Sequence, residues 1–174
     1  MKLKLRPGRL PEGVPLTHPA ALIATWFGVG LAPLAPGTWG SLAALPIGWL
    51  ALAYGDRTVL AGLVLLTLAM GTWASGVIVE RGQIRDPGLI VVDEVAAMFL
   101  TLLATPLTWW GFALAFLMFR IADIVKPFPA NWCDRHVHGG FGVMLDDLVA
   151  AVYAGAATWF LSGYVSDGLK RIAS

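Results

Sequence analysis

Charged side chains are scarce in this sequence of 174 residues, which has 12 Lys or Arg and 11 Asp or Glu, or 13% of the chain. An average soluble domain has about 25%. Hydrophobic residues make up 57%, and no charge occurs in residues 13–55, 58–79, 95–119 or 148–166. A helix over 58–79 would be about 33 Å long, enough to cross a hydrocarbon core of about 30 Å. The sequence therefore predicts a polytopic membrane protein of one domain, with a small, very apolar soluble helical protein as the alternative.

Other absences exclude further classes of protein. The single cysteine, Cys133, excludes an internal disulfide and a multi-cysteine zinc site. A net charge of +1, with scattered or paired cations, argues against a nucleic-acid partner. Residues 1–19 lack the apolar core of a cleavable signal. They carry Lys2, Lys4, Arg6 and Arg9, and we expect a basic arm on the cytoplasmic side.

Several phosphate chemistries are excluded by missing motifs. No Gly-Lys-Ser or Gly-Lys-Thr is present, so there is no P-loop. A cysteine phosphatase would need arginine at position 139, where the chain has glycine. A lipid phosphatase of the Lys, Arg-Pro and Ser-Gly-His type would need Arg-Pro where Cys133-Asp134 stands. The spaced Asp and Gly pattern of CDP-alcohol phosphotransferases is absent as well.

The apolar stretches predict an all-α bundle of about five membrane spans. Ala20–Leu34 contains Gly28, Gly30 and Pro33, so we expect a broken helix or re-entrant segment there. Complete spans are expected over three stretches: Ser41–Tyr54, Thr58–Val79 and Leu148–Ser166. The helical domain then covers residues 20–166, between the basic arm at 1–19 and a short tail at 167–174.

Val95–Phe119 is expected to form a hairpin that turns at Thr105–Thr108, rather than one long helix kinked at Pro106. A hairpin brings the charged residues at its two ends to the same membrane face. How deeply it inserts is left open. With the N-terminus inside, the inner segments carry nine of the twelve cations, in agreement with the positive-inside rule.

Polar residues are concentrated between Arg120 and Asp147, where seven of the 23 charged residues and two of the three histidines occur. A charge at the centre of a membrane costs about 2.5–3.5 kcal/mol on the insertion scale, so this cluster requires a chemical explanation. Arg120, Asp123 and Lys126 follow one another at intervals of three and would share a helix face. They could form a structural ion pair or bind a ligand.

Pairs of acids precede two of the apolar stretches, at Asp93-Glu94 and Asp146-Asp147. Either pair alone could cap a helix. Two pairs on one membrane face also suit a hard cation such as Mg²⁺, which binds carboxylate oxygens. The cations near them are suitable contacts for phosphate, and the histidines for proton transfer. The candidate residues are Arg120, Lys126 and Arg135 for phosphate, and His136 and His138, before the Gly139-Gly140 turn, for protons.

A third polar segment lies at residues 36–41, where a helix is expected to begin. Its backbone N–H groups, the small Gly37 and Gly40, and the hydroxyls of Thr38 and Ser41 could together bind an anion. The same residue types also cap ordinary helices, so this signal is weak by itself.

These segments together resemble the successive motifs of bacterial phosphatidylglycerophosphatase A. The resemblance covers about residues 20–165, in order, and rests on residues 34–42, 92–94, 119–129 and 134–147. It implies a Mg²⁺-dependent enzyme of the bacterial inner membrane, multi-pass, with its active site facing the cytoplasm. The reaction would remove the terminal phosphate of phosphatidylglycerol phosphate and yield phosphatidylglycerol.

On this hypothesis five acids supply most of the Mg²⁺ site: Asp93, Glu94, Asp123, Asp146 and Asp147. The cations and the 37–41 segment neutralise the phosphate, and His136 or His138 protonates the leaving oxygen or orders the water. Attack by water and a phospho-aspartate intermediate both remain open. Two other classes are also open, a small ion or proton carrier and a non-catalytic scaffold for lipid synthesis. A carrier would place its charges in mid-span, whereas here they stand at helix ends.

Overall fold

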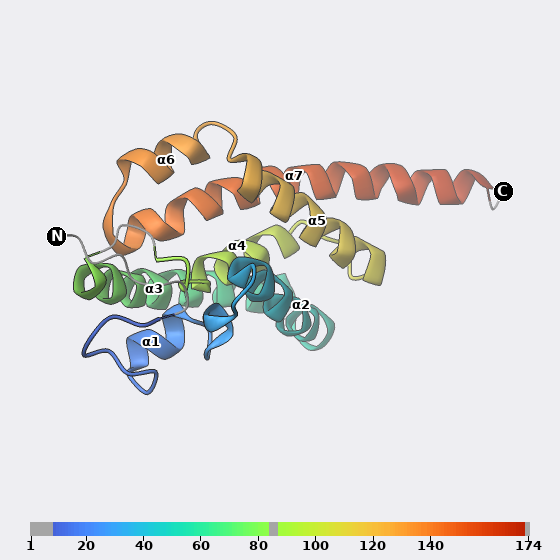
Figure 1. The fold of residues 1–174 in the computed structure, drawn as a ribbon. Helices are drawn as coiled ribbons and strands as arrows, with labels where there is room; N and C mark the ends of the chain where they lie inside the picture. The colour runs from blue at the N-terminus through green and yellow to red at the C-terminus, as the bar shows by residue number, and fades with distance from the viewer. Residues whose placement is uncertain (1–8, 84–86, 173–174) are drawn as a thin grey trace.

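The computed structural model describes residues 9–83 and 87–172, with side chains up to Tyr164. Lys2, Lys4 and Arg6 of the predicted basic arm lie outside this range, as does Arg85. The described residues form helices and no strand, which confirms the all-α prediction (Figure 1). These are α1 (Pro19–Ala24), a 3-10 turn (Val29–Leu31), α2 (Pro36–Tyr54), α3 (Arg57–Gly82), α4 (Val92–Leu102), α5 (Trp109–Val125), α6 (Ala130–His136) and α7 (Gly139–Ile172).

Helix α4 is the centre of the bundle and packs against α2, α3, α5 and α7. Its side chains are buried on nearly every side, and Met98, Phe99 and Leu102 have no exposed surface. Burying a large apolar side chain contributes roughly 1.5–3 kcal/mol, so α4 is held firmly in place. Its first turn carries Asp93 and Glu94, whose positions are therefore determined by the core.

Short polar side chains define several helix ends. Asp56 precedes α3 and accepts hydrogen bonds from the N–H groups of Thr58 (2.7 Å) and Val59 (3.1 Å). These bonds, that of Val59 first, lower the pKa of Asp56. Thr108 precedes α5 in the same way, with its hydroxyl oxygen accepting from the N–H of Gly111 at 3.1 Å. The turn between α4 and α5 contains Pro106, so the predicted hairpin is confirmed.

The last helix begins earlier than the sequence predicts. We expected it at Leu148 after a flexible Gly139-Gly140 turn, but α7 begins at Gly139. Gly140 lies directly against α3, where a Cβ would be only 2.0 Å from the carbonyl oxygen of Thr72. The glycine therefore serves close helix packing rather than a turn. As a result Asp146 and Asp147 stand inside α7 and do not cap it.

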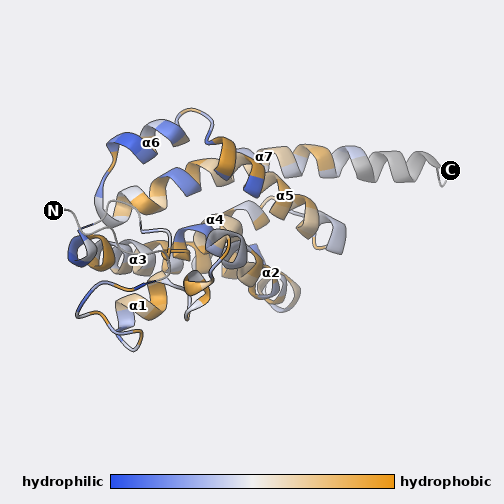
Figure 2. Cartoon of the chain, in the orientation of Figure 1, coloured by the Kyte–Doolittle hydropathy of each residue, from blue (hydrophilic) through white to orange (hydrophobic). Residues whose placement is uncertain are grey.

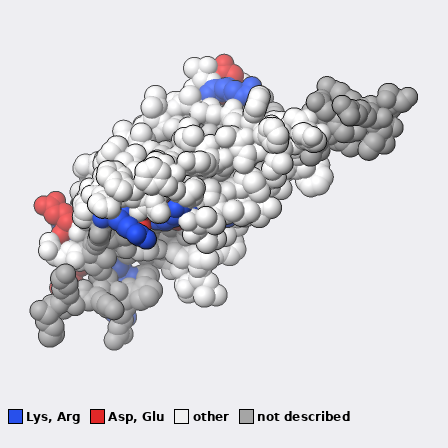
Figure 3. Space-filling model, turned by 90° about the horizontal axis from the view of Figure 1, so that it is seen from above, with Lys and Arg blue, Asp and Glu red and all other residues white. Residues whose placement is uncertain are grey.

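Two described helices, α3 and α7, are long and apolar enough to cross a membrane. Helix α5 has 17 residues and α4 has 11, so the bundle of about five spans is not confirmed by helix length. Large apolar side chains are nevertheless exposed along both candidate spans, including Leu65 and Trp73 on α3 and Val152 and Phe160 on α7. Seen from above, most of the surface has no charge (Figure 3).

Candidate active site

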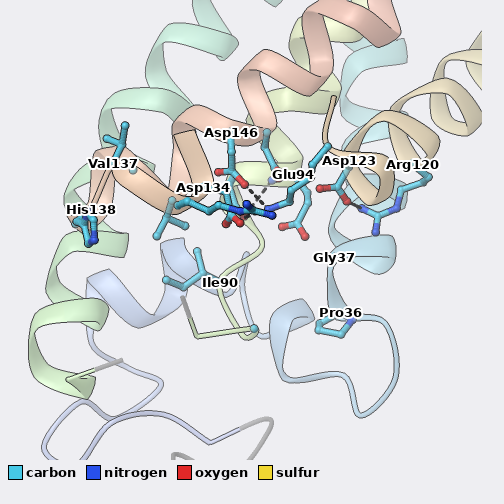
Figure 4. A pocket seen from close by; sticks show the side chains of 18 of the residues that line it. Pro36, Gly37, Ile90, Glu94, Arg120, Asp123, Asp134, Val137, His138 and Asp146 are labelled. Carbon is cyan, nitrogen blue, oxygen red and sulfur yellow. Dashed lines mark hydrogen bonds and ion pairs between the residues drawn. The ribbon is translucent and has the colours of Figure 1, made fainter. Parts of the chain in front are cut away.

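A cavity of about 470 Å³ lies where the start of α4, the end of α5, α6 and the first turns of α7 come together (Figure 4). The hydropathy colouring shows hydrophilic residues on these elements, while much of the remaining bundle is apolar (Figure 2). The candidate residues that line the cavity are Gly37, Asp93, Glu94, Arg120, Asp123, Lys126, Arg135, His138, Asp146 and Asp147. The hairpin and the α3–α7 contact thus bring three distant segments of the chain together.

Three carboxylates form the most compact group in the cavity. Oxygens of Asp93, Glu94 and Asp147 all lie within 4.8 Å of one another. Asp93 and Asp147 are buried, and among the described residues Oε2 of Glu94 is buried with no hydrogen-bond partner. Carboxylates that are buried this close together can hold a divalent cation or share a proton.

The other two acids of the prediction have cationic partners within the protein. Asp123 accepts from Nη1 of Arg120 at 3.0 Å, one helical turn away on α5. Asp146 pairs through Oδ2 with Nζ of Lys126. In Figure 4 the side chains of Glu94, Asp123 and Asp146 point into the same space from α4, α5 and α7. The five acids therefore divide into a compact group of three and two that hold cations.

Lys126 ends α5 in the left-handed conformation, with φ 46°, and its N–H donates to the carbonyl of Ala122 at 2.8 Å. Nζ lies between two carboxylates, that of Asp146 and that of Asp134 at 3.2 Å. Burial alone lowers the pKa of Lys126, but the hydrogen bonds and charges of Asp146 and Asp134 outweigh burial and raise it. Lys126 consequently stays protonated beside the cavity.

The predicted anion site at residues 37–41 is only partly on the cavity. Gly37 lines it, and a Cβ at that position would be 1.9 Å from Oε1 of Glu94, so a larger residue there would require the carboxylate or the backbone to move. The N–H groups of Thr38 and Trp39 donate to the carbonyl of Ala35, at 3.0 and 3.3 Å. Gly40 packs against Val91. Thr38, Gly40 and Ser41 are not part of the cavity wall.

Ser41 contributes from behind the wall. Its buried hydroxyl accepts a hydrogen bond from Nη1 of Arg120 at 3.3 Å and donates to the carbonyl of Gly37 at 2.9 Å. Arg120 is thereby held from two sides, by Ser41 of α2 and by Asp123 of its own helix. This arrangement orients the guanidinium toward the cavity.

The two histidines differ in position. His138 lines the cavity, and its Nδ1 lies 2.7 Å from the carbonyl oxygen of His136. A carbonyl can only accept, so Nδ1 carries the hydrogen and Nε2 is left for proton exchange. His136 is not part of the cavity wall: it stacks on Trp132 with ring centroids 5.0 Å apart, and its Nδ1 donates to the Trp132 carbonyl at 2.9 Å.

Asp134 is a cavity residue to which the sequence analysis gave no role. It lies within the polar segment 134–147, but an acid next to Arg135 could equally have been a surface residue. The signal that identifies it is its ion pair with Lys126, which depends on how α6 folds back over the end of α5.

The fold and the cavity define a class of protein: an all-helical protein whose cavity is lined by carboxylates and cations at helix ends. Residues 22–162 match the family model described as Phosphatidylglycerophosphatase A. The chain is 39% identical over 155 residues to Phosphatidylglycerophosphatase A of Escherichia coli (strain K12), covering 88% of this chain and 90% of that protein. It is 38% identical over 142 residues to Phosphatidylglycerophosphatase A of Haemophilus influenzae, covering 81% and 87%. No solved structure matches significantly.

The chain belongs to the phosphatidylglycerophosphatase A family, and it is a phosphatase. The resemblance that the motifs indicated is thus confirmed. The alternatives of a carrier and a non-catalytic scaffold are not supported by these relatives.

Proposed function

We propose that this protein hydrolyses the terminal phosphate of phosphatidylglycerol phosphate, releasing phosphatidylglycerol and inorganic phosphate. The observation that carries the proposal is the convergence of three close carboxylates and three cations in one cavity of a largely apolar protein. The printed names of the Escherichia coli and Haemophilus influenzae relatives support this substrate. The apolar exterior supports a substrate that resides in a membrane.

A divalent cation, Mg²⁺ in this proposal, fits the chemistry of the carboxylate group. Asp93, Glu94 and Asp147 offer oxygen ligands within 4.8 Å of one another, and the buried Oε2 of Glu94 has no partner among the described residues. These three residues would hold the ion. When bound, it would supply positive charge that polarises a phosphoryl oxygen.

The cations of the cavity would bind the substrate's phosphate. Arg120 is oriented by Ser41 and Asp123, and Lys126 is kept charged by Asp146 and Asp134. A planar guanidinium can bind two phosphate oxygens at once, whereas an ammonium acts as a compact charge. Arg135 lines the same cavity from α6. Asp123 and Asp146, which the sequence analysis assigned to the metal, would instead position these cations.

Proton transfer falls to His138, whose Nε2 is available because Nδ1 donates to the carbonyl of His136. It would order the attacking water or, once Nε2 has taken up a proton from that water, pass the proton to the leaving glycerol oxygen. Water is the nucleophile in this proposal because each acid near the phosphate site has another task. Asp123 is paired with Arg120 and Asp146 with Lys126, while the remaining three form the cation site.

The protein would cross the bacterial inner membrane several times, with the cavity on the cytoplasmic side. Helices α3 and α7 are the candidate spans, and α2, α4 and α5 would complete a bundle of about five. The positive-inside rule supports this orientation, since the segments that the sequence predicts on the cytoplasmic side carry nine of the twelve cations.

The deciding experiment measures phosphate release from phosphatidylglycerol phosphate by purified protein, with and without Mg²⁺. Wild type should release phosphate only with the cation, and Asp147→Asn should lose most of that activity. Asp56→Asn, an acid substitution at the end of α3 far from the cavity, is the matched control and should release phosphate as wild type does. Metal-independent release, or full activity of Asp147→Asn, would refute the cation site. Hydrolysis of other phosphate monoesters but not of this lipid would refute the assignment of phosphatidylglycerol phosphate as the substrate.

A further inference from the structure

Helix α5 exposes apolar side chains on its outer face. Its buried residues include Phe119 and Ala122, which face the core, and its charged residues Arg120 and Asp123 line the cavity. On the side away from Phe119 and Ala122, Leu117, Ile121 and Ile124 recur at helical spacing and are 52%, 47% and 74% exposed. A helix that meets water normally directs its charges outward and its apolar side chains inward. The outer face of α5 therefore requires an apolar neighbour.

The same exposed surface continues beyond the end of α5 onto α6. We call it the α5–α6 surface and define it by Leu117, Ile121, Ile124, Val125, Phe128 and Trp132. Phe128 is 72% exposed and Trp132 is 50% exposed. Polar residues of this very stretch, Lys126 and Asp134, line the cavity. An apolar outer surface and a polar inner surface thus share the same short segment of chain.

Helix α7 connects the α5–α6 surface to a candidate membrane span. The hydroxyl of Tyr153 donates to the carbonyl of Phe128 at 2.8 Å. Tyr153 and its neighbour Val152 are themselves exposed, and both lie within the candidate span Gly139–Tyr164. The apolar exterior of α7 therefore continues onto the α5–α6 surface.

We propose that the α5–α6 surface packs against the lipid leaflet that carries the substrate, with Phe128 and Trp132 at the level of the headgroups. The inference rests on the proposed function, because it assumes a lipid substrate. Aliphatic side chains on α5 give way to aromatic ones next to the cations of the cavity, the order found where a protein passes from hydrocarbon to headgroups. A lipid could then keep its acyl chains in the leaflet while its terminal phosphate reaches Arg120 and Lys126.

The first test compares two forms of phosphatidylglycerol phosphate: a long-chain lipid in phosphatidylcholine vesicles and a short-chain, monomeric analogue in water. Ile124→Asn with Phe128→Asn should reduce the ratio of vesicle to short-chain activity by about tenfold or more, given the usual contribution of a buried apolar side chain. The matched control, Ile124→Leu with Phe128→Leu, should keep the wild-type ratio. An unchanged ratio in the asparagine variant would overturn the inference.

The second test detects the contact directly, in Cys133→Ala protein reconstituted in phosphatidylcholine vesicles. A fluorescent probe attached to Phe128→Cys should be quenched by brominated phosphatidylcholine. A probe attached to Glu80→Cys, at an exposed position near the C-terminal end of α3, should be quenched by aqueous iodide. Quenching of the Phe128→Cys probe by iodide alone would overturn the inference, as would efficient crosslinking of this cysteine between two copies. Both outcomes leave phosphate release intact, whereas failure of the proposed function would abolish release from both forms of substrate.

Discussion

Arg120 and Ser41 are 79 positions apart in the chain and meet between α5 and α2, where the guanidinium donates to the serine hydroxyl at 3.3 Å. The hydroxyl in turn donates to the carbonyl of Gly37, which lines the cavity. Ser41 thus fixes the direction of the Arg120 side chain, which lines the cavity, without lining the cavity itself. Its role is positional, which gives it a distinct experimental signature.

Replacing Ser41 with alanine should reduce kcat/KM about tenfold, because a hydrogen bond to a charged group contributes about 1.5–3 kcal/mol and Asp123 still holds Arg120. Steady-state kinetics on the lipid substrate measures this change. The loss should leave the Mg²⁺ concentration required for half-maximal rate unaltered, since the hydrogen bonds of the Ser41 hydroxyl are made to Arg120 and Gly37.

Ser75→Ala is the matched control for that variant. The Ser75 hydroxyl is fully buried in α3 and has no hydrogen-bond partner among the described residues. Removing an unsatisfied hydroxyl should leave activity as in wild type and keep or raise the melting temperature. Equal loss of activity in both serine variants would contradict the positional role of Ser41.

Gly37→Ala should abolish most of the activity. A methyl group there would fall 1.9 Å from Oε1 of Glu94, so either the carboxylate or the start of α2 must move. Direct titration with Mn²⁺, followed by electron paramagnetic resonance, should show weaker binding. Gly62→Ala is the control: nothing lies within 4 Å of a Cβ at this position in α3, and alanine should stabilise the helix by about 1 kcal/mol. Undiminished Mn²⁺ binding by Gly37→Ala would contradict the expected displacement of a ligand carboxylate of Glu94.

Asp147→Asn and Asp134→Asn should separate the two roles of the acids. The first removes a member of the carboxylate group and should weaken metal binding. The second removes one of the two carboxylates that hold Nζ of Lys126, at 3.2 Å, and leaves this cation more available to phosphate. Inorganic phosphate should then inhibit Asp134→Asn roughly threefold more strongly, a modest change suited to a half-exposed ion pair. Weaker inhibition, together with weaker metal binding, would place Asp134 in the metal site instead.

The route of phosphoryl transfer can be tested through stereochemistry. Direct attack by water inverts a chiral phosphorus centre, whereas a phospho-aspartate intermediate gives two inversions and net retention. We expect inversion, because Asp123 and Asp146 are engaged by Arg120 and Lys126. Net retention with an isotopically chiral phosphate substrate, or acid-stable label on the protein, would establish the two-step route.

Much of the fold follows from sequence because it depends on local chemistry. The helix start at Pro36, the turn around Pro106 and the apolar stretch within α3 were all predicted at nearly their observed positions. The start of α7 was not, since Gly139-Gly140 has the composition of a turn and only the approach of α3 to Gly140 shows its packing role. Glycine alone does not distinguish these two uses.

The sequence also predicted which acids line the cavity better than it predicted the role of each acid. All five acids line the cavity, as their position near helix ends indicated. Which acid holds a cation depends on pairs such as Lys126 and Asp146, which are separated by 20 positions and meet only when α7 passes the end of α5. Ser41 and Asp134 owe their contacts to the same long-range packing, and no spacing rule identifies them.

A prediction about pH concerns the opposite end of the molecule. The N–H groups of Val59 and Thr58 lower the pKa of Asp56, so its carboxylate stabilises the fold above the ordinary aspartate range near 3.8. This stabilisation should disappear as the pH falls through the lowered pKa of Asp56. Thermal unfolding in detergent should therefore give a higher melting temperature for wild type than for Asp56→Asn at neutral pH. The two melting temperatures should converge in acid. A gap that is constant with pH would mean that the charge of Asp56 does not contribute.

Helix α4 combines two roles that many enzymes keep in separate elements. Its first turn presents Asp93 and Glu94 to the cavity, while Phe99 and Leu102 occupy the middle of the bundle, where Leu102 touches Gly48 of α2. A repacking of the core that shifts α4 by a fraction of an ångström would also shift the ligand oxygens. Thermostabilised versions of this protein should therefore be sought on the helix exteriors, because core substitutions will change metal affinity and stability together.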